Sequence, residues 1–450
     1  MIKKIMLENF KCFQSITADM GKITLLTGAN SSGKSSFLHS ILLLMQSTLY
    51  PFDVSINGQY VQLGGLKELS FNHDTAAMIR IGYVIKLHPI HTLGEVEIVT
   101  KWKKSVKGNS LALYGLTIGN GRASLDLKIS ADTWIISISL PGKYIRRQVK
   151  NNQTNYYHEH RLGGNPNQSY ENGMTIISIT NIPLNADIRD SLQSISYLYD
   201  EEIESIRKQG FNDLDMLLQA IEQFRWNKYK FNYINSYELP PVRTYYQTSN
   251  YGSLVKSDGD GFEQQLLFWS EVDDLQLKRL KDELKNLKAV SNIMIKHLSG
   301  GRFEIRVRAM KGKLSRSLVD VGFGISQLLP ILVADIQLEK DSILAISQPE
   351  RHLHPSMQAD LMDYFITNRS KKQYVIESHS EYMINRLRLR IAEGKINPND
   401  VKCYYFENDG FKTIEHLIKF NKDGSISDAP KSFFDTYLCD SMQIALTVTR

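Results

Sequence analysis

The sequence predicts an α/β fold in which a buried strand, a glycine-rich loop and a helix follow one another near the amino terminus. Residues 28–36 read GANSSGKSS and match the pattern GxxxxGK[ST] of phosphate-binding loops. Residues 23–27 are mostly apolar and β-prone, as expected of a buried strand, and residues 37–45 have helical periodicity. Strand, loop and helix in this order form the setting in which the pattern binds a nucleotide.

The chemistry of this loop favours the phosphates of a nucleoside triphosphate. Glycines let backbone N–H groups surround the phosphates, and the helix N-terminus adds partial positive charge. Lys34 is predicted to reach the β- and γ-phosphates, and the hydroxyl of Ser35 to coordinate Mg²⁺. A glycine-rich turn with an accidental lysine is the alternative. The predicted nucleotide-binding residues of the loop are Gly28, Asn30, Ser31, Ser32, Gly33, Lys34, Ser35 and Ser36.

Composition favours a cytoplasmic protein. The chain has 450 residues, 42% hydrophobic and 23% charged, which is enough for two or three lobes with a large core. No apolar run approaches the ~18–20 residues of a membrane span, and the amino terminus lacks a long apolar signal. The three cysteines, Cys12, Cys403 and Cys439, form no pair or metal spacing, which indicates a reducing compartment. The net charge of +6 is a weak hint of an acidic partner.

Three distant blocks carry a family resemblance. Residues 320–331 read DVGFGISQLLPI, residues 342–355 read SILAISQPERHLHP, and residues 374–381 read YVIESHSE. Together with IMLENFK at residues 5–11, they resemble the ABC-type ATPase heads of the SMC/RecF-like class. More narrowly, they resemble bacterial AAA-type ATPases with a DUF3696 tail. The resemblance covers about residues 1–70 and 237–440, and it implies a P-loop NTPase fold of the ABC-ATPase head type.

The resemblance implies roles for several residues. Gly324, Ser326 and Gln327 stand for the signature motif, which presents donors to the γ-phosphate at the start of a helix over 327–336. Glycine removes the Cβ from that approach, and the helix dipole favours the anion. His379 corresponds to the switch histidine, and Gln62 is a candidate for the glutamine that senses Mg²⁺. Because a signature in such heads contacts the ATP of another chain, we expect a homodimer or a larger even-numbered oligomer holding ATP and Mg²⁺.

The Walker B segment departs from the pattern of the family it resembles. Two polar residues normally precede Pro-Glu; the first is acidic, and the second is often the glutamate that acts as general base. Here these positions hold Ser347 and Gln348. Serine can hold a magnesium-bound water without supplying charge, and glutamine can orient a water but not deprotonate it, so hydrolysis should slow by ~10²–10⁴-fold. Three explanations stay open: a naturally slow ATPase, another acid such as Glu350 or Glu377 as base, and an engineered trapping substitution.

The histidines near Walker B also admit a metal site. A zinc or iron centre would need three or four ligands to converge. The ATPase motifs account for the same residues more economically, so we expect magnesium with ATP. The candidate ligands of such a centre are Glu350, His352, His354, Glu377 and His379.

The domain organisation predicted from these motifs is an ATPase head interrupted by two inserts. Residues 1–71 and 237–425 form the two parts of the head, and residues 426–450 form a DUF3696-like tail. Residues 72–185 alternate as in an antiparallel β-lobe, and residues 186–236 are spaced as in helices. The strands expected in the β-lobe cover 78–87, 95–101, 112–118, 123–129 and 133–140. An amphipathic, highly charged run over 275–295 is expected to form a helical arm before the signature.

The distribution of basic residues leaves nucleic-acid binding open. No helix-turn-helix, zinc finger or aromatic RNA-binding pattern accompanies the basic segments. A charge run usually forms a solvated surface, and any binding of DNA through them should be independent of sequence and sensitive to salt. The basic segments are 101–107, 143–150 and 302–316, with Arg386, Arg388 and Arg390 further on.

Three functional hypotheses follow. The first is a dimerising ATP switch that controls a separately encoded nuclease or toxin, because relatives of this architecture occur in bacterial anti-phage defence. About 70 residues follow His379 and contain no Asp-x-Asp, so we expect no fused nuclease of the TOPRIM type. The second is a RecF-like DNA-repair ATPase that clamps DNA. The third is a pseudo-ATPase scaffold that binds ATP and barely hydrolyses it.

Overall fold

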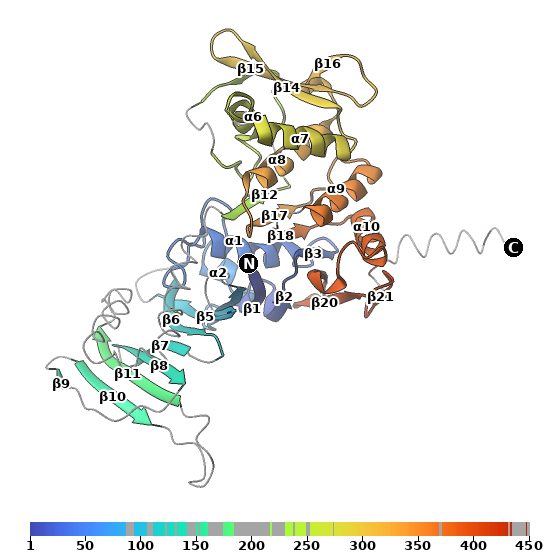
Figure 1. Ribbon diagram of the computed structural model, residues 1–450. Coiled ribbons are helices and arrows are strands. Elements are labelled where there is room, and N and C mark those ends of the chain that lie inside the picture. Colours follow the sequence, from blue (N-terminus) through green and yellow to red (C-terminus); the bar gives the residue numbers. More distant parts are fainter. Residues whose placement is uncertain are drawn as a thin grey trace. The chain divides into compact units, whose positions relative to one another are not determined.

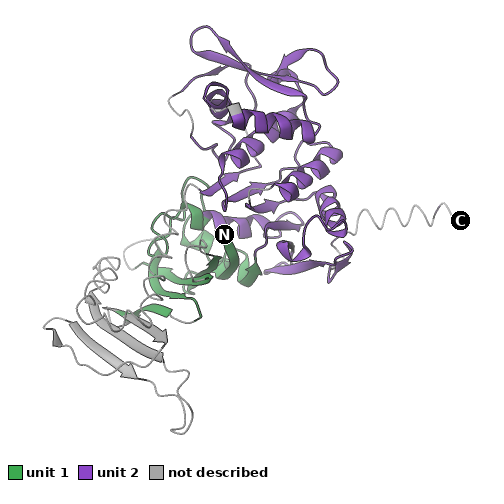
Figure 2. Ribbon diagram, in the orientation of Figure 1, with its two compact units in different colours: residues 1–19, 43–228 green, residues 20–42, 229–450 purple. Residues whose placement is uncertain are grey.

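The computed structural model divides into two compact units, shown in Figure 2. Unit 1 comprises residues 1–19 and 43–228, and unit 2 comprises residues 20–42 and 229–450. The division falls within helix α1 (Lys34–Gln46). The structure describes residues 1–86, 94–105, 111–121, 124–130, 133–141, 150–151, 154–160, 174–183, 217, 230–236, 239–248, 253–272, 274–368, 371–430, 433 and 447.

The predicted domain boundaries remain predictions. The helical insert expected over 186–236 lies outside the described residues, apart from Leu217 and residues 230–236. Most of the expected tail at 426–450 and of the basic segment at 143–150 lies outside them as well.

Unit 1 contains a ten-stranded antiparallel sheet with the order β2-β1-β4-β5-β6-β7-β8-β11-β10-β9. Alternation explains its strands, because in β4 every second side chain from Ile79 to Ile85 is buried. All five strands expected in the β-lobe are present; β1 and β2 join the same sheet, which the sequence did not indicate. The strands are β1 (Ile2–Phe10), β2 (Phe13–Asp19), β4 (Ile79–Lys86), β5 (Glu95–Lys104), β6 (Leu111–Gly119), β7 (Ser124–Ser130), β8 (Thr133–Pro141), β9 (Lys150–Asn151), β10 (Thr154–His160) and β11 (Met174–Pro183). The short helices α2 (Leu66–Leu69) and η1 (Phe71–His73) belong to this unit.

Unit 2 is built on a seven-stranded sheet with the order β12-β17-β18-β3-β19-β20-β21. Strands β12, β17, β18, β3 and β19 run parallel, and β20 and β21 continue antiparallel. All residues of β3, β17 and β18 are buried, as expected of parallel strands covered on both faces. The strands are β3 (Ile23–Gly28), β12 (Phe231–Ile234), β17 (Ile343–Ser347), β18 (Gln373–Glu377), β19 (Val401–Asn408), β20 (Thr413–Phe420) and β21 (Ile426–Ser427).

Helices cover this sheet on its two faces. On one face, Phe37 of α1 packs against Tyr404 and Phe406 of β19. Side chains alternate along β19, so Cys403 and Tyr405 point to the other face. There they join a core formed with α8, α9 and α10. Figure 1 shows α9 and α10 lying next to each other in this unit. The helices of unit 2 besides α1 are α6 (Phe262–Glu271), α7 (Asp274–Asn286), α8 (Phe323–Gln337), α9 (Pro355–Thr367) and α10 (Glu381–Ala392), with the 3₁₀ turns η3 (Leu318–Asp320) and η4 (Pro398–Asp400).

A smaller antiparallel sheet lies near α6 and α7 in unit 2 (Figure 1). It contains β13 (Tyr245–Tyr246), β14 (Asn292–Leu298), β15 (Arg302–Arg308) and β16 (Ser315–Ser317). The expectation of one amphipathic helix over 275–295 is wrong, because α7 ends at Asn286 and β14 begins at Asn292. Lys288 has a left-handed φ of 54°, and the Ala289 N–H donates to the Leu284 carbonyl, which is the C-terminal motif that ends a helix. Among the described helices, none is long and apolar enough to cross a membrane.

Candidate nucleotide site

The loop predicted to bind phosphates follows β3 and begins α1. Three of its residues have positive φ: Gly28 at 138°, Ser31 at 59° and Gly33 at 110°. A Cβ at Gly28 would lie 2.3 Å from the carbonyl oxygen of Phe406, so glycine is required by both backbone conformation and space. Such left-handed turns point successive N–H groups into a concave surface that suits an anion.

The side chain of Lys34 is folded back over this loop. Its Nζ donates hydrogen bonds to the carbonyl oxygens of Gly28 at 3.0 Å and Ala29 at 2.6 Å. Burial lowers the pKa of Lys34, while the carboxylates of Glu377 and Glu350 act in the opposite direction. These two acids are therefore close enough to influence the lysine of the loop.

The carboxyl ends of β17 and β18 meet the start of α1 at one edge of the sheet. Ser347 ends β17, Glu377 ends β18, and the two residues are paired in register. The hydroxyl of Ser35 donates to Oε1 of Glu377 at 2.6 Å, and the hydroxyl of Ser347 donates to Oε2 at 3.1 Å. The Tyr233 hydroxyl of β12 lies 3.2 Å from that of Ser347. Hard oxygen donors converge here, as Mg²⁺ prefers.

Glu350 and His379 lie at the same edge. Oε1 of Glu350 accepts a hydrogen bond from the backbone N–H of His379 at 2.7 Å. Oε2 of Glu350 is buried and has no hydrogen-bond partner among the described residues. Burial raises the pKa of Glu350, and it lowers that of His379, which Lys34 lowers further. The site thus has one carboxyl group with an unused oxygen and an exposed imidazole that favours its neutral form.

Gln348 and the remaining histidines have local structural contacts. Gln348 has a positive φ of 48°, and its N–H donates to the carbonyl of Glu377 at 2.7 Å. His354 caps α9 by accepting a hydrogen bond from the Ser356 N–H. His352 packs edge-on against Phe323. Within the described part of the chain, no group of three or more acidic, histidine or cysteine residues is arranged to hold a metal ion.

The predicted signature residues lie at the beginning of α8, which starts at Phe323, four residues earlier than expected. A Cβ at Gly324 would lie 2.7 Å from the His352 carbonyl oxygen, so this glycine allows the helix to approach the segment after Walker B. Ser326 is buried and donates its hydroxyl to the Phe323 carbonyl at 2.7 Å, and Gln327 is buried as well.

A salt bridge fixes the turn before α8. Both terminal nitrogens of Arg243 donate to the carboxylate of Asp320, at 3.0 and 2.7 Å. This bidentate geometry is specific to arginine and holds the segment that leads into the helix.

The other predicted loop residues are placed as follows. Asn30 and Ser31 are exposed, Ser36 is half-buried, and Ser32 is buried with no partner for its hydroxyl among the described residues. Gln62 belongs to unit 1, where its amide donates to the carbonyl of Gly58 at 2.8 Å, so its proposed role toward Mg²⁺ stays a prediction.

Two contacts were not foreseen from the sequence. The sequence suggests Glu377 as a substitute base or as a ligand of a zinc or iron centre, whereas its carboxylate contacts the loop residue Ser35. Tyr233 was not considered at all, although residues 231–234 form a short β-prone run that the structure pairs with Walker B. An acidic residue ending a buried strand was the one signal available for Glu377.

Comparison with known families now decides the classification. Residues 1–384 match the model of the AAA ATPase domain family. The chain belongs to the AAA ATPase domain family. Residues 396–443 match the family DUF3696, described as a protein of unknown function. ATP is therefore the nucleotide, and ATP hydrolysis is the reaction of the family. A search of curated proteins found no match.

Solved structures show weaker likenesses to this ATPase. A crystal structure of the SmcHead bound to the C-winged helix domain of ScpA aligns with TM-score 0.46 and 10% identity, over 93% of this chain and 98% of that chain. A Pyrococcus furiosus Smc head with an extended coiled coil, bound to the C-terminal domain of ScpA, aligns with TM-score 0.42 and 11% identity, over 100% and 99%. The SMC head domain from Thermotoga maritima aligns with TM-score 0.40 and 9% identity, over 93% and 99%. These likenesses are too weak to indicate a shared activity.

Proposed function

We propose that this ATPase is a slow, dimerising ABC-type switch of the cytoplasm that controls a separately encoded effector, a nuclease or toxin, in bacterial anti-phage defence. The observation that carries the nucleotide part is the contact of the loop residue Ser35 with Glu377 beside Ser347. The dimer, the effector and the defence context rest on the motif resemblance.

The residues of the loop hold the phosphates in this proposal. Lys34 exchanges the carbonyl oxygens of Gly28 and Ala29 for phosphate oxygens, and the N–H groups of the loop complete the cradle. Bound Mg²⁺ neutralises developing charge on the phosphates. Ser35 is the loop residue that would hold it, and the hydroxyl of Ser347 lies beside the same carboxylate that Ser35 contacts.

Glu350 is proposed as the general base. Its Oε2, which no residue in the described ranges hydrogen-bonds, can accept a proton from water, and its raised pKa strengthens it as a base. Gln348 orients the water, and His379 contacts the γ-phosphate as a neutral imidazole. Because Glu350 stands two positions beyond the usual base, we expect slow turnover.

Replacing Lys34 by Ala tests the nucleotide site. Calorimetry should show loss of ATP binding, because the cation that contacts the phosphates is gone, while circular dichroism stays unchanged. Lys395, which pairs with Glu393 on the surface, offers a matched control: Lys395→Ala should bind ATP normally. Equal affinity in Lys34→Ala and the parent protein would show that the site is assigned wrongly.

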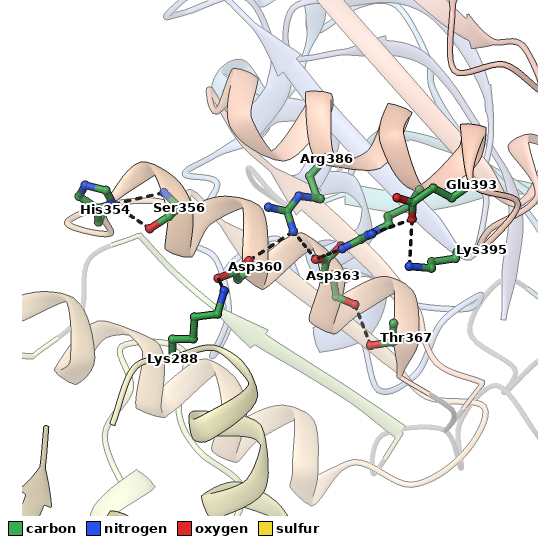
Figure 3. Close-up of polar contacts among 10 residues, drawn as sticks. Lys288, His354, Ser356, Asp360, Asp363, Thr367, Arg386, Glu393 and Lys395 are labelled. Carbon is green, nitrogen blue, oxygen red and sulfur yellow. Dashed lines mark hydrogen bonds and ion pairs between the residues drawn. The ribbon is translucent and has the colours of Figure 1, made fainter. Parts of the chain in front are cut away.

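A DNA-clamping ATPase is the second candidate, favoured by the basic residues from Arg302 to Arg316, which lie on β15, the loop after it and β16. Arg386 and Arg390 of α10 give it less support, because both pair with Asp363 of α9 (Figure 3). Turnover stimulated by DNA, falling steeply with salt, would favour this function over effector control. Genes adjacent to this one, and proteins that co-purify with it, test the effector directly.

A further inference from the structure

The negative charge at the nucleotide edge comes from β18 instead of β17. Ser347, at the end of β17, is neutral, and Glu377, its partner in register at the end of β18, carries a carboxyl group. Neighbouring strands lie only about 4.8 Å apart, so a long side chain on one strand can serve the position of its neighbour. The order of the sheet, β17-β18-β3, places β18 next to the strand that leads into the loop.

The oxygen atoms around Glu377 are spaced like neighbouring metal ligands. Ser35 Oγ lies 2.6 Å from Oε1, and Ser347 Oγ lies 3.1 Å from Oε2. Adjacent ligands of an octahedral Mg²⁺ with bonds of 2.0–2.1 Å are about 2.9 Å apart. We propose that Glu377 supplies the carboxylate of the magnesium site in place of the Walker B acid, with Ser347 as its positioning residue.

The charge balance of the site supports this assignment. Glu377 is only 4% exposed, and a buried carboxylate is costly without a cation. Its two oxygens accept hydrogen bonds from neutral hydroxyls, and among the described residues no ion pair includes it. Lys34 is near, but its Nζ is bound to two carbonyl oxygens of the loop. A second carboxyl group, that of Glu350, is close enough to interact with Glu377. The edge therefore holds two acids and needs a further positive charge.

Tyr233 sets the direction of the Ser347 hydroxyl. The tyrosine hydroxyl lies 3.2 Å from Ser347 Oγ, which in turn donates to Glu377. A hydroxyl has one proton to donate and two lone pairs to accept, so Ser347 can accept from Tyr233 while donating to Glu377. The serine thus orients a carboxylate that the neighbouring strand provides.

The proposal rests on the proposed nucleotide site and is tested by the effect of Mg²⁺ on nucleotide binding. Calorimetry measures the affinity for a non-hydrolysable ATP analogue once with Mg²⁺ and once with EDTA. We call the ratio of the affinity in Mg²⁺ to the affinity in EDTA the magnesium increment. Glu377→Gln should reduce this increment at least ~10-fold, as loss of groups that support a metal does. Its affinity in EDTA should be equal or higher, because a negative charge near the phosphates is removed. Asp428→Asn, which replaces an exposed carboxylate paired with Lys419, is the control and should keep the increment.

Moving the carboxylate back to β17 provides the decisive variant. Ser347→Asp combined with Glu377→Ser should restore the increment lost in Glu377→Gln. Electron paramagnetic resonance of Mn²⁺ with the analogue should show bound metal in the parent and the double variant, and markedly less in Glu377→Gln. An unchanged increment in Glu377→Gln overturns the proposal. If Glu377→Gln fails to fold, the double variant Ser347→Asp with Glu377→Ser decides instead. Binding of the analogue by this variant without a magnesium increment would also overturn the proposal.

Failure of this inference is distinct from failure of the proposed function. A parent protein that binds no analogue in either condition refutes the nucleotide site itself. If the parent binds the analogue with a magnesium increment, and Glu377→Gln shows the same increment, only the role of Glu377 is refuted.

Discussion

At the residue scale, catalysis in this ATPase depends on which acid lies near the folded-back Lys34. Ser347 and Gln348 stand where the motif resemblance places the Walker B acids, and neither side chain can take a proton from water. Glu350 has a raised pKa and a buried oxygen to which no described residue hydrogen-bonds, and both suit a general base. Glu350, two positions further along the sequence than Gln348, is therefore the acid that we propose as the base.

The first prediction at this scale concerns turnover. We expect kcat below the ~1–10³ s⁻¹ typical of enzymes, and a further fall of ~10²–10⁴-fold in Glu350→Gln with ATP affinity preserved. Gln348→Glu should raise kcat, because it places a base in the usual position. Steady-state phosphate release measures kcat of the parent protein, Glu350→Gln and Gln348→Glu. Several turnovers per second in Glu350→Gln would exclude Glu350 as the base.

At the element scale, ion pairs join α9 to α10. Figure 3 shows Asp363 of α9 with Arg386 of α10, and Glu393 with Lys395. Arg390 of α10 pairs with both Asp363 and Glu393. Burial alone would raise the pKa of Asp363, but hydrogen bonds from Arg390 and Arg386 outweigh it, so the pKa is below its ordinary value. The carboxylate form is thus favoured in the folded protein.

Replacing Asp363 by Asn should destabilise unit 2 by roughly 1–2 kcal/mol, because hydrogen bonds to a charged group are lost in a partly solvated site. A lowered pKa stabilises the fold above the ordinary pKa of Asp, and this contribution is lost as pH falls through the folded pKa. The difference in Tm between the parent and Asp363→Asn should therefore narrow below about pH 4. Thermal unfolding followed by circular dichroism measures this difference in Tm. Asp282→Asn, at an exposed position, is the control. A constant difference from pH 7 to pH 3 would contradict this account.

At the scale of the whole molecule, the start of α8 is the segment expected to meet a second copy. Phe323 is 44% exposed there, and Gly322 precedes it with an exposed backbone. Ser326, a predicted signature residue of the same helix, is buried, so a large substitution there would disturb the fold instead. Gly322 is the better position, because φ is −57° and no atom lies within 4 Å of an added Cβ.

Gly322→Arg should abolish dimers that form on addition of ATP, because the large charged side chain would project at the proposed contact. Light scattering with and without ATP measures the mass, and calorimetry checks that ATP still binds. Val272→Arg, at the exposed end of α6, is the control and should dimerise like the parent. A parent protein that stays monomeric at all concentrations with ATP would refute the dimer.

The sequence by itself determined the phosphate loop, because its strand, glycines, lysine and helix are contiguous and their spacing is set by backbone geometry. It also determined the five strands β4 to β8 of unit 1 from alternation. The end of α7 was missed, because periodicity continues past Asn286 while a left-handed Lys288 ends the helix.

Only the tertiary structure decided which side chains share the nucleotide edge. Ser35 and Glu377 are 342 residues apart in the chain, and their contact depends on β18 pairing with β3 and β17. Strand order is a property of long-range pairing, which local propensity does not encode. Burial likewise turned Ser326 inward and left Oε2 of Glu350 without a partner in the described part of the chain, because packing fixes what each side chain can reach.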